Sequence, residues 1–100
     1  MPRIPEPSLD PLPDAALLRR VARRDSTALN ELQRRHGPSL YAIAYAILMD
    51  AQRAEQVVVD VFEQAWFDAL RATGPHGPGA WLRRMTKERA QQFRSAPSLA

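Results

Sequence analysis

The feature that most constrains the fold is a run of apolar residues that recurs at helical spacing between residues 54 and 70. Apolar side chains that recur every three or four residues lie on one side of an α-helix. The run lasts for about five turns, so this helix must bury a wide apolar face against other elements. Its members are Ala54, Val57, Val58, Val61, Phe62, Ala65, Trp66, Ala69 and Leu70. The sequence therefore predicts a long core helix, with Asp50 as its N-cap.

Two further helical patterns precede the core helix. Asp14 is expected to cap a first helix through Arg24, and Asp25 to cap a second one. The second pattern crosses Pro38, which lacks a backbone donor and crowds the preceding turn. We therefore expect a kink or a break near Gly37, with the same face continuing beyond it. The residues that these helices should bury are Leu17, Leu18 and Val21 in the first and Leu29, Leu32, Leu40, Ile43, Ala44 and Ile47 in the second.

A fourth helix follows a loop that is rich in glycine and proline. The loop, Thr73 to Gly79, ends the core helix because these residues at such density favour turns. The helix from Ala80 to Arg94 is basic, and its inner side carries Leu82, Met85, Thr86 and Phe93. Since no segment alternates as a strand would, the predicted fold is all-α: a small bundle of about four helices.

The two ends of the chain are not expected to join this bundle. Residues 1–13 contain five prolines, which exclude a helix, and are predicted to form a disordered leader. Residues 14–95 are predicted to form the helical domain and residues 96–100 a flexible tail. One hundred residues with 45% hydrophobic content bury only one small core, so a single domain is expected.

The composition excludes several kinds of site and location. Cysteine is absent, so the chain has neither a disulfide nor a thiolate metal site. The longest apolar run, Tyr41 to Met49, is too short to span a bilayer, and prolines interrupt the region where a signal peptide would be apolar. We therefore expect a cytoplasmic chain with no membrane partner.

No group of residues has the pattern of a catalytic or metal site. The glycines of the predicted loop follow no strand, as a phosphate-binding loop would require. Asp60 and Glu63 share a helical face, as carboxylates in a bundle metal site do, but no Glu-x-x-His spacing accompanies them. His36 is expected at a kink or on the surface rather than as a ligand. We therefore expect no enzyme activity, no cofactor and no metal.

Charge divides the chain into segments of opposite sign. Residues 14–35 are rich in arginine, residues 50–71 are mainly acidic, and residues 80–94 are basic again. An acidic helix between basic segments suggests two different partners. On the outward side of the core helix, Val59 and Phe67 lie among acids, a pattern that often marks a protein contact. Alternatively, both side chains pack under the first helix or the leader.

Two segments and the loop between them resemble region 2 of the sigma-70 family, in particular the small extracytoplasmic-function sigma factors. The segments are AEQVVVDVFEQAW, Ala54 to Trp66, and AWLRRMTKERA, Ala80 to Ala90. Residues 17–48 are similar to the opening helices of the family, including the proline before a Leu-Tyr pair. In the family a second domain, region 4, binds upstream promoter DNA. The sequence ends before region 4 could begin, so it is either one domain of a longer protein or a protein without that half.

The resemblance implies two partners. In this family the third helix docks on the clamp helices of the largest catalytic subunit of the RNA polymerase core. The loop and the fourth helix capture melted bases on the nontemplate strand of the minus-ten promoter element. The resemblance also allows an anti-sigma factor as a partner. The implied polymerase-binding residues are Glu55, Gln56, Val59, Asp60 and Glu63, and the implied DNA-binding residues are Trp81, Arg84, Lys87, Glu88 and Arg89.

Some positions depart from the usual family residues and favour other interpretations. Gln56 and Val59 replace polar or acidic residues, and Glu88 and Gln92 replace an asparagine and an aspartate. A divergent sigma-like module that works through protein contacts, as an adaptor, decoy or regulatory target without promoter recognition, is therefore an alternative. A basic amphipathic helix on a membrane surface is another, because Trp81, Leu82, Met85 and Phe93 stand among arginines.

Glu88 has three interpretations if the fourth helix faces DNA. Its carboxylate repels the phosphates, or it folds back on Arg84 one turn earlier, or it accepts a hydrogen bond from a flipped base.

Overall fold

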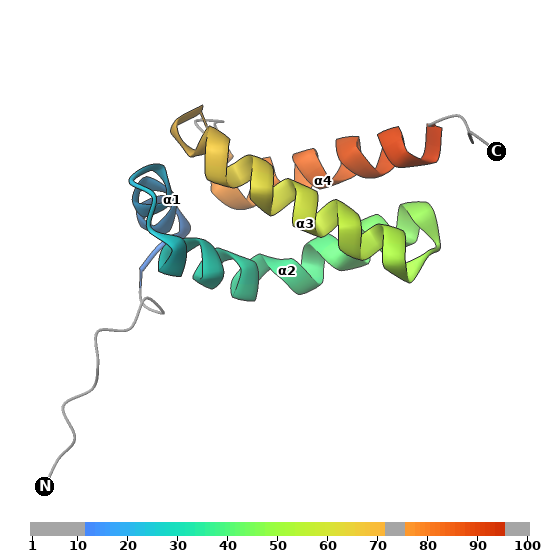
Figure 1. Cartoon of the computed structure of the whole chain (residues 1–100), viewed down its shortest axis with the longest axis horizontal. Coiled ribbons are helices and arrows are strands. Elements are labelled where there is room, and N and C mark those ends of the chain that lie inside the picture. The colour runs from blue at the N-terminus through green and yellow to red at the C-terminus, as the bar shows by residue number, and fades with distance from the viewer. Residues whose placement is uncertain (1–11, 72–75, 96–100) are drawn as a thin grey trace, which may run out of the picture.

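The computed structural model describes residues 12–71 and 76–95, and these residues form a bundle of helices (Figure 1). No strand occurs in this part of the chain, so the predicted all-α bundle of four helices is confirmed. The predicted disorder of residues 1–11 and 96–100 falls outside the described residues. The elements are α1 (Asp14–Ala22), α2 (Ser26–Leu48), α3 (Ala51–Asp68), the short 3-10 helix η1 (Ala69–Arg71) and α4 (Gly77–Ser95).

The long helix α2 packs most extensively against α3 and α4, and it also contacts α1. Figure 1 shows α3 running between α2 and α4, while α1 lies at one end of the bundle. The apolar faces predicted from helical spacing meet in the centre. The largest fully buried side chains come from all four helices: Leu17, Leu32, Leu40, Leu82, Val21, Val57, Val61 and Thr86. The hydroxyl of Thr86, the one polar side chain in this set, donates to the Leu82 carbonyl oxygen at 2.7 Å.

Two of the three predicted N-caps are confirmed. Asp25 accepts a hydrogen bond from the Thr27 backbone N–H at 3.0 Å, and Asp50 caps α3 in the same manner. Both carboxylates satisfy backbone donors that the first turn leaves without a partner. The prediction for α1 is wrong, because Pro13 is the N-cap and Asp14 is the first helical residue. The Asp14 carboxylate is bound to α2 instead.

The helix α2 continues through Pro38. Of the kink or break predicted near Gly37, the break therefore does not occur, and the same face continues beyond the proline as predicted. A proline in a helix interior costs about 3 kcal/mol. Leu32 before the proline and Leu40 after it are both fully buried, and burial of each contributes roughly 1.5–3 kcal/mol. Burial of apolar side chains on both sides of the proline therefore offsets its cost.

The connection between α3 and α4 differs from the prediction at both of its ends. The chain leaves α-helical geometry after Asp68, and the 3-10 spacing turns Leu70 outward, where it is 79% exposed. At the other end, α4 begins at Gly77 rather than at Ala80. Pro78 is tolerated there because a backbone N–H in the first turn would have no helical partner.

The apolar side of α4 faces the core, not the surface. Trp81, Leu82 and Met85 are all buried, whereas a helix lying on a membrane would have to expose them. The membrane-surface interpretation of this helix is therefore wrong. In the described part of the chain, no helix combines the length and the hydropathy that a membrane span requires.

Candidate functional site

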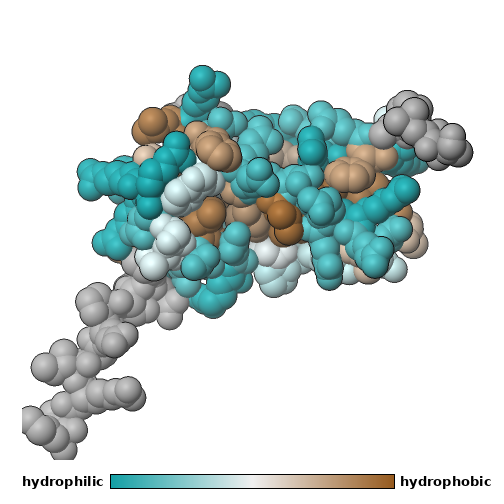
Figure 2. Space-filling model, in the orientation of Figure 1, coloured by the Kyte–Doolittle hydropathy of each residue, from teal (hydrophilic) through white to brown (hydrophobic). Residues whose placement is uncertain are grey.

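Four of the five residues predicted to bind polymerase are exposed on the outward side of α3. Glu55, Gln56 and Glu63 are exposed, and Val59 between them is 56% exposed. Further along, Phe67 is 65% exposed. Packing under α1 therefore does not bury Val59 or Phe67, and the surface of α3 combines acidic and apolar groups. Figure 2 shows that hydrophobic atoms on the visible face form separate patches among hydrophilic ones, including along the seam between α2 and α3.

The outward side of α4 carries most of the residues predicted to bind DNA. Arg84, Lys87, Glu88 and Arg89 are exposed. Trp81 differs, because it is only 8% exposed and belongs to the core. Its indole therefore offers little more than an edge to a base, and its main contribution is packing.

One ion pair joins the two predicted surfaces. The Arg89 guanidinium donates to the Asp60 carboxylate, with Nη2–Oδ2 at 3.1 Å and Nε–Oδ2 at 3.3 Å. Gln56 donates to the other oxygen of Asp60 at 2.9 Å. The guanidinium also lies over the ring of Phe93, 5.8 Å from its centroid. Asp60, predicted to face polymerase, is thus turned toward α4.

Two hollows lie along the seam between α3 and α4. The hollows adjoin each other, since Gln64 and Arg89 line both of them, and together they are called the groove. The groove presents carboxylates, amides and a guanidinium, so it is suited to hydrogen bonding rather than to an apolar ligand. One hollow of about 220 Å³ is lined by Asp60, Glu63, Gln64, Phe67 and Arg89, and one of about 190 Å³ by Gln64, Met85, Glu88, Arg89 and Gln92.

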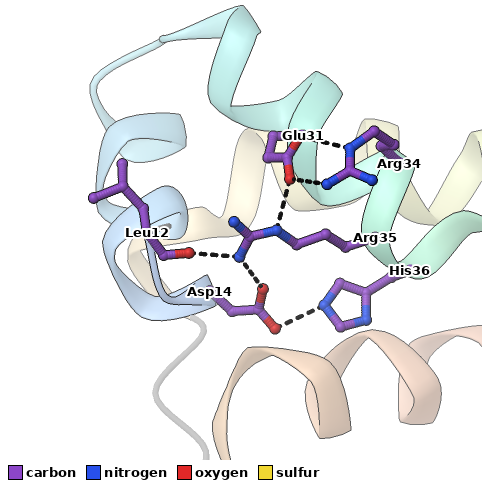
Figure 3. Close-up of polar contacts among 6 residues, drawn as sticks. All are labelled: Leu12, Asp14, Glu31, Arg34, Arg35 and His36. Carbon is purple, nitrogen blue, oxygen red and sulfur yellow. Dashed lines mark hydrogen bonds and ion pairs between the residues drawn. The ribbon is translucent and has the colours of Figure 1, made fainter. Parts of the chain in front are cut away.

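A polar cluster fixes α1 against α2, as Figure 3 shows. The Arg35 guanidinium donates to the Leu12 carbonyl oxygen at 2.6 Å, to Asp14 at 3.2 Å and to Glu31 at 2.7 Å. His36 bonds the other oxygen of Asp14, with Nε2–Oδ2 at 2.7 Å. Every charged group in this cluster has a partner within the fold.

The same cluster lowers the pKa of one of its two acids, Glu31. Hydrogen bonds from Arg34, at 2.7 and 2.8 Å, and from Arg35 lower the pKa of Glu31 from 4.5 to about 2. The Glu31–Arg34 and Glu31–Arg35 contacts could be inferred from helical spacing. The Asp14–His36 contact could not, because its partners lie 22 residues apart. The sequence predicts His36 at a kink or on the surface. In the structure its side chain is half-buried, bonded to Asp14 of α1 and close to Gly79 of α4.

Arg24 holds the turn between α1 and α2 against the end of α3. Its backbone is left-handed, with φ 66°, and its guanidinium donates to the Trp66 carbonyl oxygen. The guanidinium carbon lies 5.3 Å from the Trp66 ring centroid and 5.7 Å from that of Phe67. A cation at a helix C-terminus and over aromatic rings is stabilising on both counts. No sequence pattern indicated this contact.

Nothing in the arrangement resembles a metal centre. Within residues 12–71 and 76–95, no group of three or more histidine, aspartate or glutamate side chains is placed to hold an ion.

Comparison with known protein families identifies the family to which the chain belongs. The model of the family "Sigma-70 region 2" matches residues 32–96, which is more than half of the chain and includes most of α2 and all of α3 and α4. The chain therefore belongs to the sigma-70 region 2 family. Searches of curated proteins and of solved structures gave no match. Region 2 is a domain of transcription initiation factors rather than of enzymes, and the family binds the RNA polymerase core and acts in promoter melting.

Proposed function

We propose that this chain is a sigma region 2 domain of the extracytoplasmic-function type. In this proposal α3 docks on the clamp helices of the RNA polymerase core, and α4 holds the melted nontemplate strand of the minus-ten element. The observation that carries the proposal is that the family match spans both helices, while each helix keeps an exposed charged side of opposite sign. An anti-sigma factor that covers either side would regulate the domain.

The polymerase side depends on charges that the fold itself does not use. Within the described residues, Glu55 and Glu63 form no ion pair, so both are available to a basic partner. Val59 lies between them and adds an apolar contact from which water is excluded on docking. Charges at such a surface mainly set specificity and the rate of association.

The DNA-binding side, on α4, likewise carries charges that the fold does not use, but these charges are positive. Arg84 and Lys87 are exposed and form no ion pair in the described part of the chain, so they can hold phosphates, and each such contact makes binding weaker as salt rises. Trp81 keeps a place in the proposal only through its exposed edge. The predicted base-capturing loop, Thr73 to Pro78, lies partly outside the described residues.

The test of polymerase docking is a charge reversal at Glu55. Glu55→Arg should weaken binding to the isolated clamp-helix coiled coil at least tenfold, about 1.4 kcal/mol. Glu55 is a cleaner choice than Asp60, because a change at Asp60 also breaks its contact with Arg89. Glu88→Arg, the same reversal on α4, is the matched control and should bind as the wild type does. Equal binding by wild type and Glu55→Arg would show that this side of α3 is not the docking face.

The second candidate is a sigma-like module that acts through protein contacts alone. It is favoured by the exposure of Val59 and Phe67 among acids and by Glu88, which puts a negative charge on the outward side of α4. On this interpretation the domain binds the coiled coil but gains no affinity for minus-ten single strands when polymerase core is present. That combination separates the two candidates.

A further inference from the structure

We propose that the exposed arginines of α1 bind the phosphate backbone of double-stranded DNA next to the melted segment. Arg19 and Arg20 lie on α1 and Arg23 is its C-cap. All three are exposed, and none of them forms an ion pair within residues 12–71 and 76–95. The inference rests on the proposed function, because it takes α4 as the surface for single-stranded DNA and adds a contact to the adjoining duplex.

The two acids that flank α1 in the described part of the chain, Asp14 and Asp25, are already bound to other groups. Asp14 is bound by Arg35 and His36, and Asp25 caps α2. The charge of Arg20 is one of several causes that lower the pKa of Asp25, after the hydrogen bond from Thr27. Arg19 and Arg23 therefore carry the least compensated positive charge on α1, and a polyanion is the partner that such a surface fits.

The position of α1 connects this charge to the basic side of α4. α1 contacts α4, and a Cβ placed on Gly79 would lie 3.3 Å from both His36 Cε1 and Arg83 Nη1. His36 also bonds Asp14, the first residue of α1, so the first turn of α4 at Gly79 lies close to the first turn of α1. The exposed arginines of α1 and those of α4 therefore belong to neighbouring helices.

The spacing of these arginines suits a DNA backbone. At 1.5 Å per residue, Arg19 and Arg23 lie about 6 Å apart along the helix axis. One strand of a duplex has a phosphate about every 3.4 Å of helix axis, so the two guanidinium groups can contact about two phosphates of one strand. The α1 sequence, DAALLRRVA, offers no aromatic ring on which an unpaired base could stack. The contact therefore fits the backbone of a paired duplex rather than unpaired bases.

The experiment compares two double variants that remove equal charge. Arg19→Gln with Arg23→Gln changes α1, whereas Arg53→Gln with Arg94→Gln changes the start of α3 and the end of α4. Figure 1 shows the start of α3 and the end of α4 at the opposite end of the bundle from α1. Each variant is bound, at saturating polymerase core, to a fork with a minus-ten-like single strand beside a duplex and to the single strand alone.

The α1 variant should bind the fork about five- to tenfold more weakly at low salt, and its salt slope should fall by up to about 2. It should bind the single strand as the wild type does, and the control variant should bind both probes normally. Unchanged thermal melting would show that the fold is intact.

Other outcomes overturn the inference. Equal losses for both double variants would mean that only net charge matters. Equal losses on fork and single strand would place α1 on unpaired DNA, and loss of binding to phosphatidylglycerol vesicles without any loss on the fork would point to a membrane instead. If the wild type binds both probes and the α1 variant matches it, the inference alone fails. If the wild type binds neither probe, the proposed function fails together with it.

Discussion

The polar cluster between α1 and α2 and the outward side of α4 are both rich in charge, but they use it differently. In the cluster, Arg35 donates hydrogen bonds to both Glu31 and Asp14. On α4, Arg84, Lys87 and Glu88 are exposed, and in the described residues none of them is in an ion pair. The first group fixes one helix on another, whereas the second is left to a partner.

The difference shows how to separate structural from functional charge in a small domain. A charge that is bonded inside the fold must give up that bond before it can serve a ligand, which costs free energy. A charge without a partner costs nothing to engage beyond its hydration and side-chain entropy. Substitutions in the cluster should therefore change stability, and substitutions on α4 should change binding.

The largest expected effect concerns the charges of α4 that have no partner in the fold. At about 6 Å and an effective dielectric near 20, a carboxylate repels a phosphate by roughly 2–3 kcal/mol before salt screening. Glu88 forms no ion pair with Arg84 in the structure. The interpretation in which the carboxylate folds back on Arg84 is therefore not supported. Glu88→Asn should strengthen binding to minus-ten-like single strands about three- to tenfold with polymerase core present, and the gain should shrink as salt rises.

The other outcomes for Glu88→Asn are equally informative. A loss confined to particular sequences would identify Glu88 as a residue that reads a flipped base. No change on any strand would mean that this side of α4 does not face DNA, and it would favour the protein-contact module.

Helical spacing was enough to predict the fold, because the apolar faces of all four helices are local patterns. The caps at Asp25 and Asp50 followed from the same local rules, and both are confirmed. The continuity of α2 through Pro38 was not predictable in this way. It depends on the burial of Leu32 before the proline and of Leu40 after it, a tertiary effect that outweighs a local preference.

The candidate site was predicted in part. Spacing placed Glu55, Glu63 and Arg84 on outward sides, where the structure has them. It did not reveal that Trp81 is buried, because a tryptophan at the start of a helix suits both a core and a surface. The Asp60–Arg89 pair joins residues 29 positions apart, and no periodic pattern carries such contacts.

A smaller effect tests the paired side of the comparison. Because the pKa of Glu31 is about 2 in the fold and 4.5 is its ordinary value, unfolding takes up a proton between these values. The stabilising contribution of Glu31 is therefore complete above about pH 4.5 and is lost as the pH falls toward 2. Thermal melting of wild type and Glu31→Gln from pH 7 to 2 should show the two midpoints converging as the acid is protonated. A difference that stays constant with pH would show that the charge of Glu31 is not what stabilises the cluster.

The smallest effect concerns the Asp60–Arg89 pair, which lies between the two classes of charge. Its side chains are 20% and 46% exposed, so solvent screens the attraction, and such pairs contribute about 0.2–1 kcal/mol. A double-mutant cycle with Asp60→Asn and Arg89→Gln, measured by denaturant unfolding, should give a coupling energy in that range. Glu63→Gln in place of Asp60→Asn is the matched control, because Glu63 lines the same groove but does not bond Arg89, and its cycle should give no coupling. A coupling energy well above 1 kcal/mol would place the pair with the structural cluster, and Asp60 would then be a residue that holds α3 on α4 rather than one that is free to meet polymerase.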